Sequence, residues 1–316
     1  MTTNPADSRT PDSSASLAAA VACICFGASV VATRYVVPQT TPVVLAFLRY
    51  VIAGICMFAM LRGRALEPMP RRDRAQIALL GALFFGLFPW SFSGSLTHLP
   101  SATVALIVAT NPLVTLALSV LRGTERLSAR IVVGQLLALA GIVLAIDPAH
   151  AAATQTSSGT NHWVGYVLAF TTVICGAVYN VWSRPLLLRY PSAQVTSWAM
   201  VAGVLSLAPL ALLQGLGAHT RTISSNGWLA VLFLGTLGGA VGFGLWSYAL
   251  RRSTPSRVAV FLALNPISAI ALGVFLLGEP ITMRLILALV AVLAGINLAV
   301  RTPAVTVSAP ARAPAS

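Results

Sequence analysis

The chain has 316 residues, of which 57% are hydrophobic and only 9% are charged, and its mean hydropathy is +0.85. Soluble domains carry roughly 25% charged residues, so the composition excludes an aqueous globular protein and indicates an integral membrane protein. The net charge of +13 is the difference between 20 arginines and 7 acidic residues. These arginines lie in short segments between apolar runs instead of on one soluble face, which argues against a nucleic-acid partner and for membrane topology.

A Ser/Thr/Pro-rich segment, residues 1–16, opens the chain, and we expect it to be a disordered cytoplasmic tail. Ten apolar stretches follow, each of a length that lets a helix cross a hydrocarbon core of about 30 Å. The stretches cover residues 17–33, 42–61, 75–96, 101–121, 129–146, 163–183, 194–214, 228–250, 258–277 and 281–300. The lipid bilayer is therefore an expected partner of the protein.

The arginines between these stretches predict the orientation. With the N-terminus inside, 16 of the 20 arginines fall on the inner side, and only Arg221 and Arg284 fall on the outer side. Such a bias marks the cytoplasmic face, so both termini are predicted to be cytoplasmic.

Part of the chain occurs twice. Residues 101–127 and 255–281 align at a shift of 154 positions, and each copy carries an Asn-Pro pair in the middle of an apolar run. The aligned pairs are Asn111-Pro112 with Asn265-Pro266, Glu125 with Glu279, Arg130 with Arg284 and Gly141 with Gly295. Proline removes a backbone hydrogen bond and kinks a helix, so Pro112 and Pro266 are predicted hinges. Paired kinks in equivalent halves point to a binding site near the bilayer midplane.

The repeat predicts an all-α membrane protein of ten helices in two halves, residues 17–146 and 162–300. Because each half has an odd number of helices, the second half inserts upside down, as in many secondary transporters. Residues 147–161 are the predicted periplasmic linker, and residues 301–316 are a second cytoplasmic tail.

The motifs make the resemblance specific. They are CFGASVVATRYV (25–36), AFLRY (46–50), GTERLSAR (123–130), GEPITMR (278–284), GQLLALAGIVLAI (134–146) and ALVAVLAGINLAV (288–300). These motifs recur in order in both halves, and over about residues 17–300 the chain resembles an EamA-type member of the drug/metabolite transporter superfamily. Arg34 stands where many relatives have lysine, and Pro280 stands where a basic residue is more usual. The resemblance implies export of small metabolites, often amino acids, by alternating access.

Arg49 lies inside the second apolar stretch, where a charge needs a partner or a wet cavity. One interpretation is a cation that holds a substrate carboxylate; the other is an arginine that snorkels or binds backbone carbonyls. Ser29, Thr33, Tyr179 and Asn180 are the further candidates for substrate contact. Asn111 and Asn265 either line the same cavity or satisfy backbone groups that the prolines free.

Glu125 with Arg130, and Glu279 with Arg284, form either a helix cap with an ion pair or a gate. The sequence places no Asp or Glu within a predicted helix core, so we expect a facilitator or exchanger unless a boundary glutamate carries a proton.

The predicted function is secondary transport in the bacterial inner membrane, with export of amino acids or related small metabolites. Efflux of drugs or toxic compounds is the alternative. An intramembrane enzyme or a channel is the rival from a different class, but the sequence has no catalytic motif, charged ring or carbonyl filter. No cofactor or metal is expected, and a monomer or a homodimer is compatible with the sequence.

Overall fold

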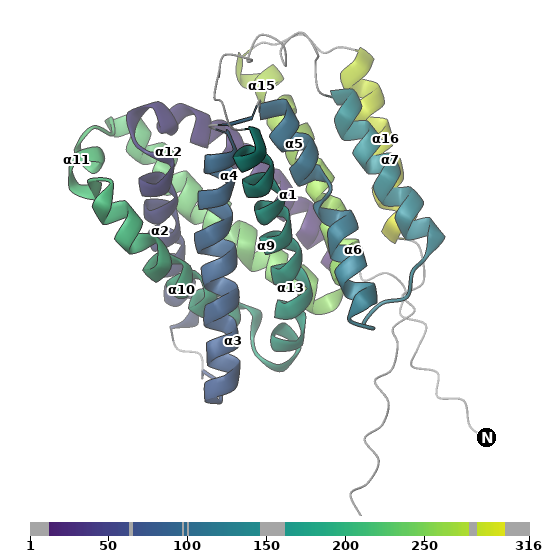
Figure 1. Cartoon of the computed structure of the whole chain (residues 1–316), viewed down its shortest axis with the longest axis horizontal. Coiled ribbons are helices and arrows are strands. Elements are labelled where there is room, and N and C mark those ends of the chain that lie inside the picture. The colour runs from purple at the N-terminus through teal and green to yellow at the C-terminus, as the bar shows by residue number, and fades with distance from the viewer. Residues whose placement is uncertain are drawn as a thin grey trace, which may run out of the picture.

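The computed structural model describes residues 13–62, 66–96, 98–99, 101–145, 162–277 and 283–300, and these residues form helices without a strand. Figure 1 shows the helices as one bundle. Large apolar side chains such as Leu17, Leu121 and Leu213 are exposed on the bundle surface, as expected where lipid replaces water.

The first half contains α1 (Ser13–Val36), the 3-10 turn η1 (Val37–Gln39), α2 (Pro42–Leu61), α3 (Arg71–Gly81), the π-helix η2 (Ala82–Leu87), α4 (Phe88–Leu96), α5 (Ser101–Ala109), α6 (Asn111–Leu121) and α7 (Ala129–Ala145). The start of α2 shows how local sequence begins a helix, with a capping hydroxyl and a proline in the first turn. The Thr41 hydroxyl accepts a hydrogen bond from the Val44 amide, and Pro42 occupies the first turn, where its missing N–H costs nothing.

The second half contains α9 (His162–Arg189), α10 (Ser192–Leu213), α11 (Leu216–Arg221), α12 (Ser225–Gly235), the π-helix η3 (Thr236–Val241), α13 (Gly242–Arg252), α14 (Pro255–Ala259), the 3-10 segment η4 (Val260–Ala263), α15 (Leu264–Leu277) and α16 (Met283–Val300). The short helix α11 was not predicted. It lies in the connection between α10 and α12, and Gly215 precedes it in the left-handed conformation.

Seven helices of the described residues are long and apolar enough to cross a membrane. The helices of residues 129–144 and 286–300 are apolar but shorter, and the apolar segment that begins at Pro255 is divided among α14, η4 and α15. Every predicted stretch falls on helical structure, but a count of ten spans remains a prediction.

The two halves repeat their backbone irregularities. The π-helix η2 begins at residue 82 and η3 begins at residue 236, a separation of 154 positions that equals the shift of the sequence repeat. Both Asn-Pro helices are also interrupted at the predicted place. Thr110 separates α5 from α6 just before Asn111, and η4 separates α14 from α15 just before Asn265.

Helices α7 and α16 pack together through small residues. A Cβ atom on Gly134 would lie 2.6 Å from the carbonyl oxygen of Gly295, and a Cβ atom on Gly141 would lie 2.9 Å from that of Ala288. The contacts run in opposite directions along the two helices, so α7 and α16 are antiparallel. Figure 1 shows them side by side at one end of the bundle.

Two boundaries differ from the prediction. The tail expected over residues 1–16 is shorter in the structure, because α1 already begins at Ser13, where an alanine-rich run favours helix. Helix α9 continues past residue 183 to Arg189 and contains Pro185. The linker 147–161, the C-terminal tail 301–316 and Glu279 lie outside the described residues.

Candidate functional site

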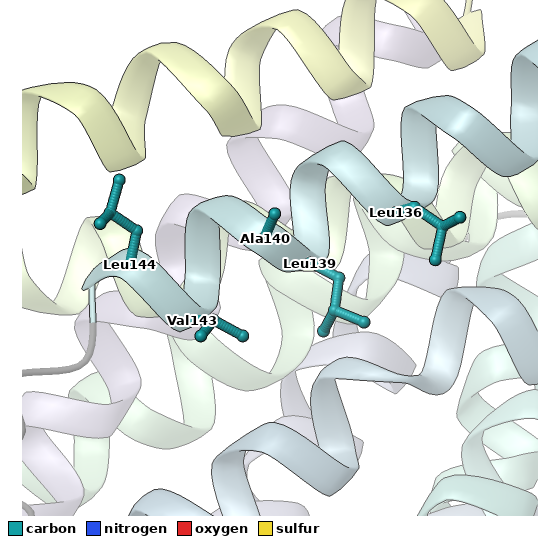
Figure 2. Close-up of a pocket in the computed structure, with 5 residues that line it drawn as sticks. All are labelled: Leu136, Leu139, Ala140, Val143 and Leu144. Carbon is teal, nitrogen blue, oxygen red and sulfur yellow. The ribbon is translucent and has the colours of Figure 1, made fainter.

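A shallow pocket on α7 is lined by Leu136, Leu139, Ala140, Val143 and Leu144. Figure 2 shows these five side chains along a single helix. Ligand sites need a few polar groups that fix orientation, and this pocket has none among its lining side chains. It therefore suits contact with lipid better than recognition of a polar solute.

The polar candidate lies at the predicted Arg49. The Nη2 atom of Arg49 donates a 3.1 Å hydrogen bond to the backbone carbonyl of Gly238, which belongs to the π-helix η3. The Nε atom of Arg49 is buried and has no hydrogen-bond partner among the described residues. Ser29 is buried beside Gly238, and its hydroxyl donates to the Cys25 carbonyl.

Aromatic rings surround the guanidinium group. The Cζ atom of Arg49 lies 5.5 Å from the ring centroid of Tyr50 and 5.8 Å from that of Phe243. Such distances give a favourable cation–π interaction. We refer to Arg49, Ser29, Gly238, Tyr50 and Phe243 as the arginine–aromatic cluster.

The cluster continues through further rings to the predicted Tyr179. Phe85 of the π-helix η2 packs edge-on against Tyr50 at 5.2 Å and against Tyr179 at 5.8 Å. Phe84 stacks on Tyr179 with centroids 4.2 Å apart. Both π-helices therefore meet the same aromatic region: η2 contributes rings, and η3 contributes a backbone carbonyl. π-Helical turns occur frequently at functional sites.

The structure brings Asn111 and Asn180 together in a buried hydrogen-bond network. Asn111 Nδ2 donates to the Val173 carbonyl at 3.0 Å, and Asn180 Nδ2 donates to Asn111 Oδ1 at 3.5 Å. Asn180 Oδ1 accepts a 3.1 Å hydrogen bond from the Trp246 indole. These amides join α6, α9 and α13, so in this conformation their hydrogen-bonding capacity is used within the protein.

Asn265 differs from its counterpart Asn111. Its Oδ1 atom is buried without a hydrogen-bond partner among the described residues, while the side chain as a whole is only half-buried. Thr33 is also half-buried, one turn beyond Ser29 on α1. Pro112 lies in the first turn of α6, and Pro266 lies near the start of α15.

The predicted pairing of Glu125 with Arg130 is not seen in the structure. Arg130 is exposed, whereas the buried Glu125 carboxylate accepts hydrogen bonds from the backbone amide and the hydroxyl of Ser256. The physical reason is that α14 of the other half lies closer to the carboxylate than the exposed end of α7 does. The equivalent pair of Glu279 and Arg284 lies outside the residues whose side chains the structure describes.

Sequence reasoning missed several residues of these sites. Asp73, assigned to a loop, lies buried in the first turn of α3 and accepts a 2.7 Å hydrogen bond from the Tyr190 hydroxyl. Arg257, counted among the cytoplasmic arginines, is 8% exposed. The chain separation between partners explains both omissions, since only the packing of the two halves brings them together.

Comparison with known proteins places this geometry in context. The model of the EamA-like transporter family matches residues 13–146 and 163–301. An uncharacterized transporter of Archaeoglobus fulgidus is 27% identical over 87% of this chain and 95% of its own length. A protein of Streptantibioticus cattleyicolor, described as a probable terminal-alkyne amino-acid exporter, is 30% identical over 74% of this chain and 76% of its own. A solved crystal structure with 23% identity superposes with a TM-score of 0.75 and covers 91% of this chain and 97% of its own.

Proposed function

Because the chain belongs to the EamA-like transporter family, we propose that it exports amino acids or related carboxylate-bearing metabolites across the bacterial inner membrane. Transport would proceed by alternating access between two inverted five-helix halves, ten spans in all, with both termini in the cytoplasm. The bias of the arginines toward one side supports this orientation. The name of the relative from S. cattleyicolor is consistent with an amino-acid solute.

The observation that carries the proposal is the incompletely paired guanidinium of Arg49. A charge inside an apolar bundle is costly and is retained where it has a function. Among the residues that the structure describes, Arg49 has one hydrogen bond, to the Gly238 carbonyl, and its buried Nε has no partner. A guanidinium has five donors in a planar fork that fits both oxygens of a carboxylate. The free donors therefore suit the carboxylate of a solute.

The rings around Arg49 suit the rest of such a solute. Tyr50 and Phe243 come from different halves of the chain, and their ring centroids lie 5.5 Å and 5.8 Å from the Arg49 guanidinium carbon. Phe26 and Phe84 are half-buried next to this region, so they offer apolar surface to a side chain. A lipophilic cation would meet the positive charge of Arg49 at the same place, and for this reason we favour metabolites over cationic drugs.

The positions of the carboxylates support a facilitator or an exchanger. Among the described residues, Asp73 and Glu125 are the buried carboxylates, and both lie at the ends of helices that we assign to the cytoplasmic side. Neither is part of the arginine–aromatic cluster. A proton relay through the centre of the membrane would need an ionisable group at that depth.

The test is counterflow of labelled amino acids in proteoliposomes that contain the full-length chain. We expect saturable exchange that falls roughly 30-fold or more in Arg49→Ala, because loss of one partner of a buried charge pair costs about 2–5 kcal/mol and each 1.4 kcal/mol is tenfold. Arg49→Lys keeps the charge but loses the fork, so it should retain intermediate activity. Arg221→Ala, in the α11 segment, is the control that should exchange like wild type.

Two outcomes would count against the proposal. Undiminished exchange in a folded Arg49→Ala variant would make Arg49 a structural residue. Absence of exchange with every amino acid, together with ethidium flux by the wild type, would favour drug efflux.

A further inference from the structure

A second cluster of charged and polar side chains is buried where the two halves meet at the predicted cytoplasmic end. Glu125, between α6 and α7, is 5% exposed, while Ser256 is 0% and Arg257 8% exposed. Arg184 of α9 completes the set. We refer to these four residues as the Glu125 cluster. None of them belongs to the arginine–aromatic cluster.

The Glu125 carboxylate is held as a bound anion would be. One oxygen accepts a 3.3 Å hydrogen bond from the Ser256 amide, and the other accepts from the Ser256 hydroxyl. Arg257 directly follows Ser256 in the chain, and Arg184 donates from Nε to the carbonyl of Ser253, three positions before Ser256. Both arginines therefore belong to, or bind, the segment that holds the carboxylate. Carboxylate recognition commonly combines an amide, a hydroxyl and a guanidinium group in this way.

The Glu125 cluster contains buried hydrogen-bonding atoms that have no partner among the described residues. The Arg257 side chain is more than nine-tenths buried. Its Nε and Nη2 atoms nevertheless have no hydrogen-bond partner among the described residues. The Oγ1 atom of the nearby Thr254 is also buried without a partner. Arg184, by contrast, uses its Nε to bind the Ser253 carbonyl. With two guanidinium groups against one carboxylate, the cluster carries an excess of positive charge.

We propose that Ser256, Arg257 and Arg184 form a carboxylate-binding subsite at the cytoplasmic mouth, which Glu125 fills in this conformation and a solute carboxylate fills when Glu125 leaves. The identity of the solute and the assignment of this end to the cytoplasm rest on the function proposed above.

The residues of the Glu125 cluster come from different halves of the chain, and this division couples opening of the mouth to solute binding. Glu125 belongs to the first half, whereas Ser256, Arg257 and Arg184 belong to the second. Separation of the halves at this end would therefore remove the carboxylate and leave two guanidinium groups without a counter-charge. Like charges that remain close together without a counter-charge repel one another. A cytoplasmic carboxylate that enters the subsite offsets this cost, so opening of the mouth and loading of solute become coupled.

Chemical rescue tests the subsite without transport. Glu125→Ala removes the carboxylate and leaves space for a small one, so sodium formate should raise the melting temperature of the purified variant in a saturable manner, as a ligand of the folded state does. Glu125→Gln is the matched control, because its amide fills the same space and should prevent the response. The double variant Glu125→Ala/Arg257→Gln should lose the response. If Glu125→Ala does not fold, Glu125→Ser leaves similar space.

The outcomes separate the possibilities. A formate response no larger than that of the wild type, or one that survives in the double variant, would overturn the subsite. An equal response to choline chloride would assign a general anion site and overturn carboxylate recognition. Since rescue is measured on the purified protein, its failure leaves the counterflow result for Arg49 intact, and failure of counterflow leaves the rescue intact.

Discussion

Gly134 and Gly295 meet across two antiparallel helices so closely that a Cβ atom on Gly295 would lie 2.5 Å from the carbonyl oxygen of Gly134. The repeat relates Gly295 to Gly141 and relates Ala288 to Gly134. Gly134 contacts Gly295, and Gly141 contacts Ala288, so the contact is the same when the two halves are exchanged. A twofold relation between the halves therefore passes through this pair of helices.

We predict that Gly295→Ala destabilises the protein by roughly 1–3 kcal/mol, because the added methyl group would have to displace backbone atoms. The measurement is thermal unfolding in detergent. Gly54→Ala is the matched control, since a Cβ atom there would meet nothing within 4 Å. Alanine is also the better helix former by up to about 1 kcal/mol, so the control should be as stable as wild type or more so. Equal melting temperatures for the two variants would contradict the close packing.

We predict that Gly238→Ala weakens solute binding more than it slows turnover. The new methyl group would overlap the Ser29 hydroxyl. A shift of the Gly238 backbone away from this overlap would move the carbonyl that accepts the hydrogen bond from Arg49. Concentration dependence of counterflow should give a KM raised several-fold. Adding Ser29→Ala removes the overlapping oxygen and should restore part of the affinity. If the two substitutions act additively, with no such restoration, the contact does not position Arg49.

Asn111 and Asn265 are equivalent in the repeat, but we predict that their replacement by leucine affects different properties. Asn111→Leu should lower stability, and Asn265→Leu should lower exchange. Asn111→Leu removes the hydrogen bonds that join Asn111 to the Val173 carbonyl and to the Asn180 amide, and loss of such buried hydrogen bonds costs about 1–3 kcal/mol. Asn265→Leu removes an oxygen that lacks a partner within the described part of the chain, so stability should change little, while exchange should fall. Melting temperature and counterflow measured on both variants decide the matter. A larger loss of stability in Asn265→Leu would refute this assignment.

The bond between Tyr190 and Asp73 predicts a change at high pH. The hydrogen bond to Asp73, followed by burial, raises the pKa of the Tyr190 hydroxyl above its ordinary value of 10.0. A group whose pKa is raised on folding stabilises the folded state below its unfolded pKa, and this stabilisation is lost as the pH rises through the folded pKa. The melting temperature of wild type should therefore exceed that of Tyr190→Phe by a constant amount up to about pH 9, and the difference should shrink above pH 10. A difference that grows with pH would exclude the bond.

The sequence is sufficient to predict those features whose pattern is periodic or repeated along the chain. The apolar stretches predicted the helices, the two Asn-Pro pairs predicted the interruptions before Asn111 and Asn265, and the motifs predicted the family, which the family match confirms. Arg49 was singled out because a charge in an apolar run is visible from its neighbours alone.

Other features depend on packing between distant segments, and the neighbouring residues in the sequence do not indicate them. Nothing next to Glu125 indicates that its partner is Ser256, which lies 131 positions away. From the sequence, Arg257 is predicted to be one more exposed cytoplasmic arginine, but the packing of α14 buries it. The π-helices are also not apparent from the sequence, since Ala82–Leu87 and Thr236–Val241 are identical at only one aligned position, Leu83 and Leu237. Long-range contacts, and not local propensity, determine each of these features.

The two π-helices have a consequence for how the halves diverged. They keep one backbone shape at equivalent positions, yet the first presents the bulky Phe84 and Phe85 where the second presents Gly238 and Gly239. After duplication the backbone was preserved and the side-chain volume was reassigned. A perfectly inverted pair of repeats would make the path identical from either side of the membrane. In this protein one half contributes rings to the shared aromatic region and the other contributes bare backbone, so the two halves are chemically unequal there.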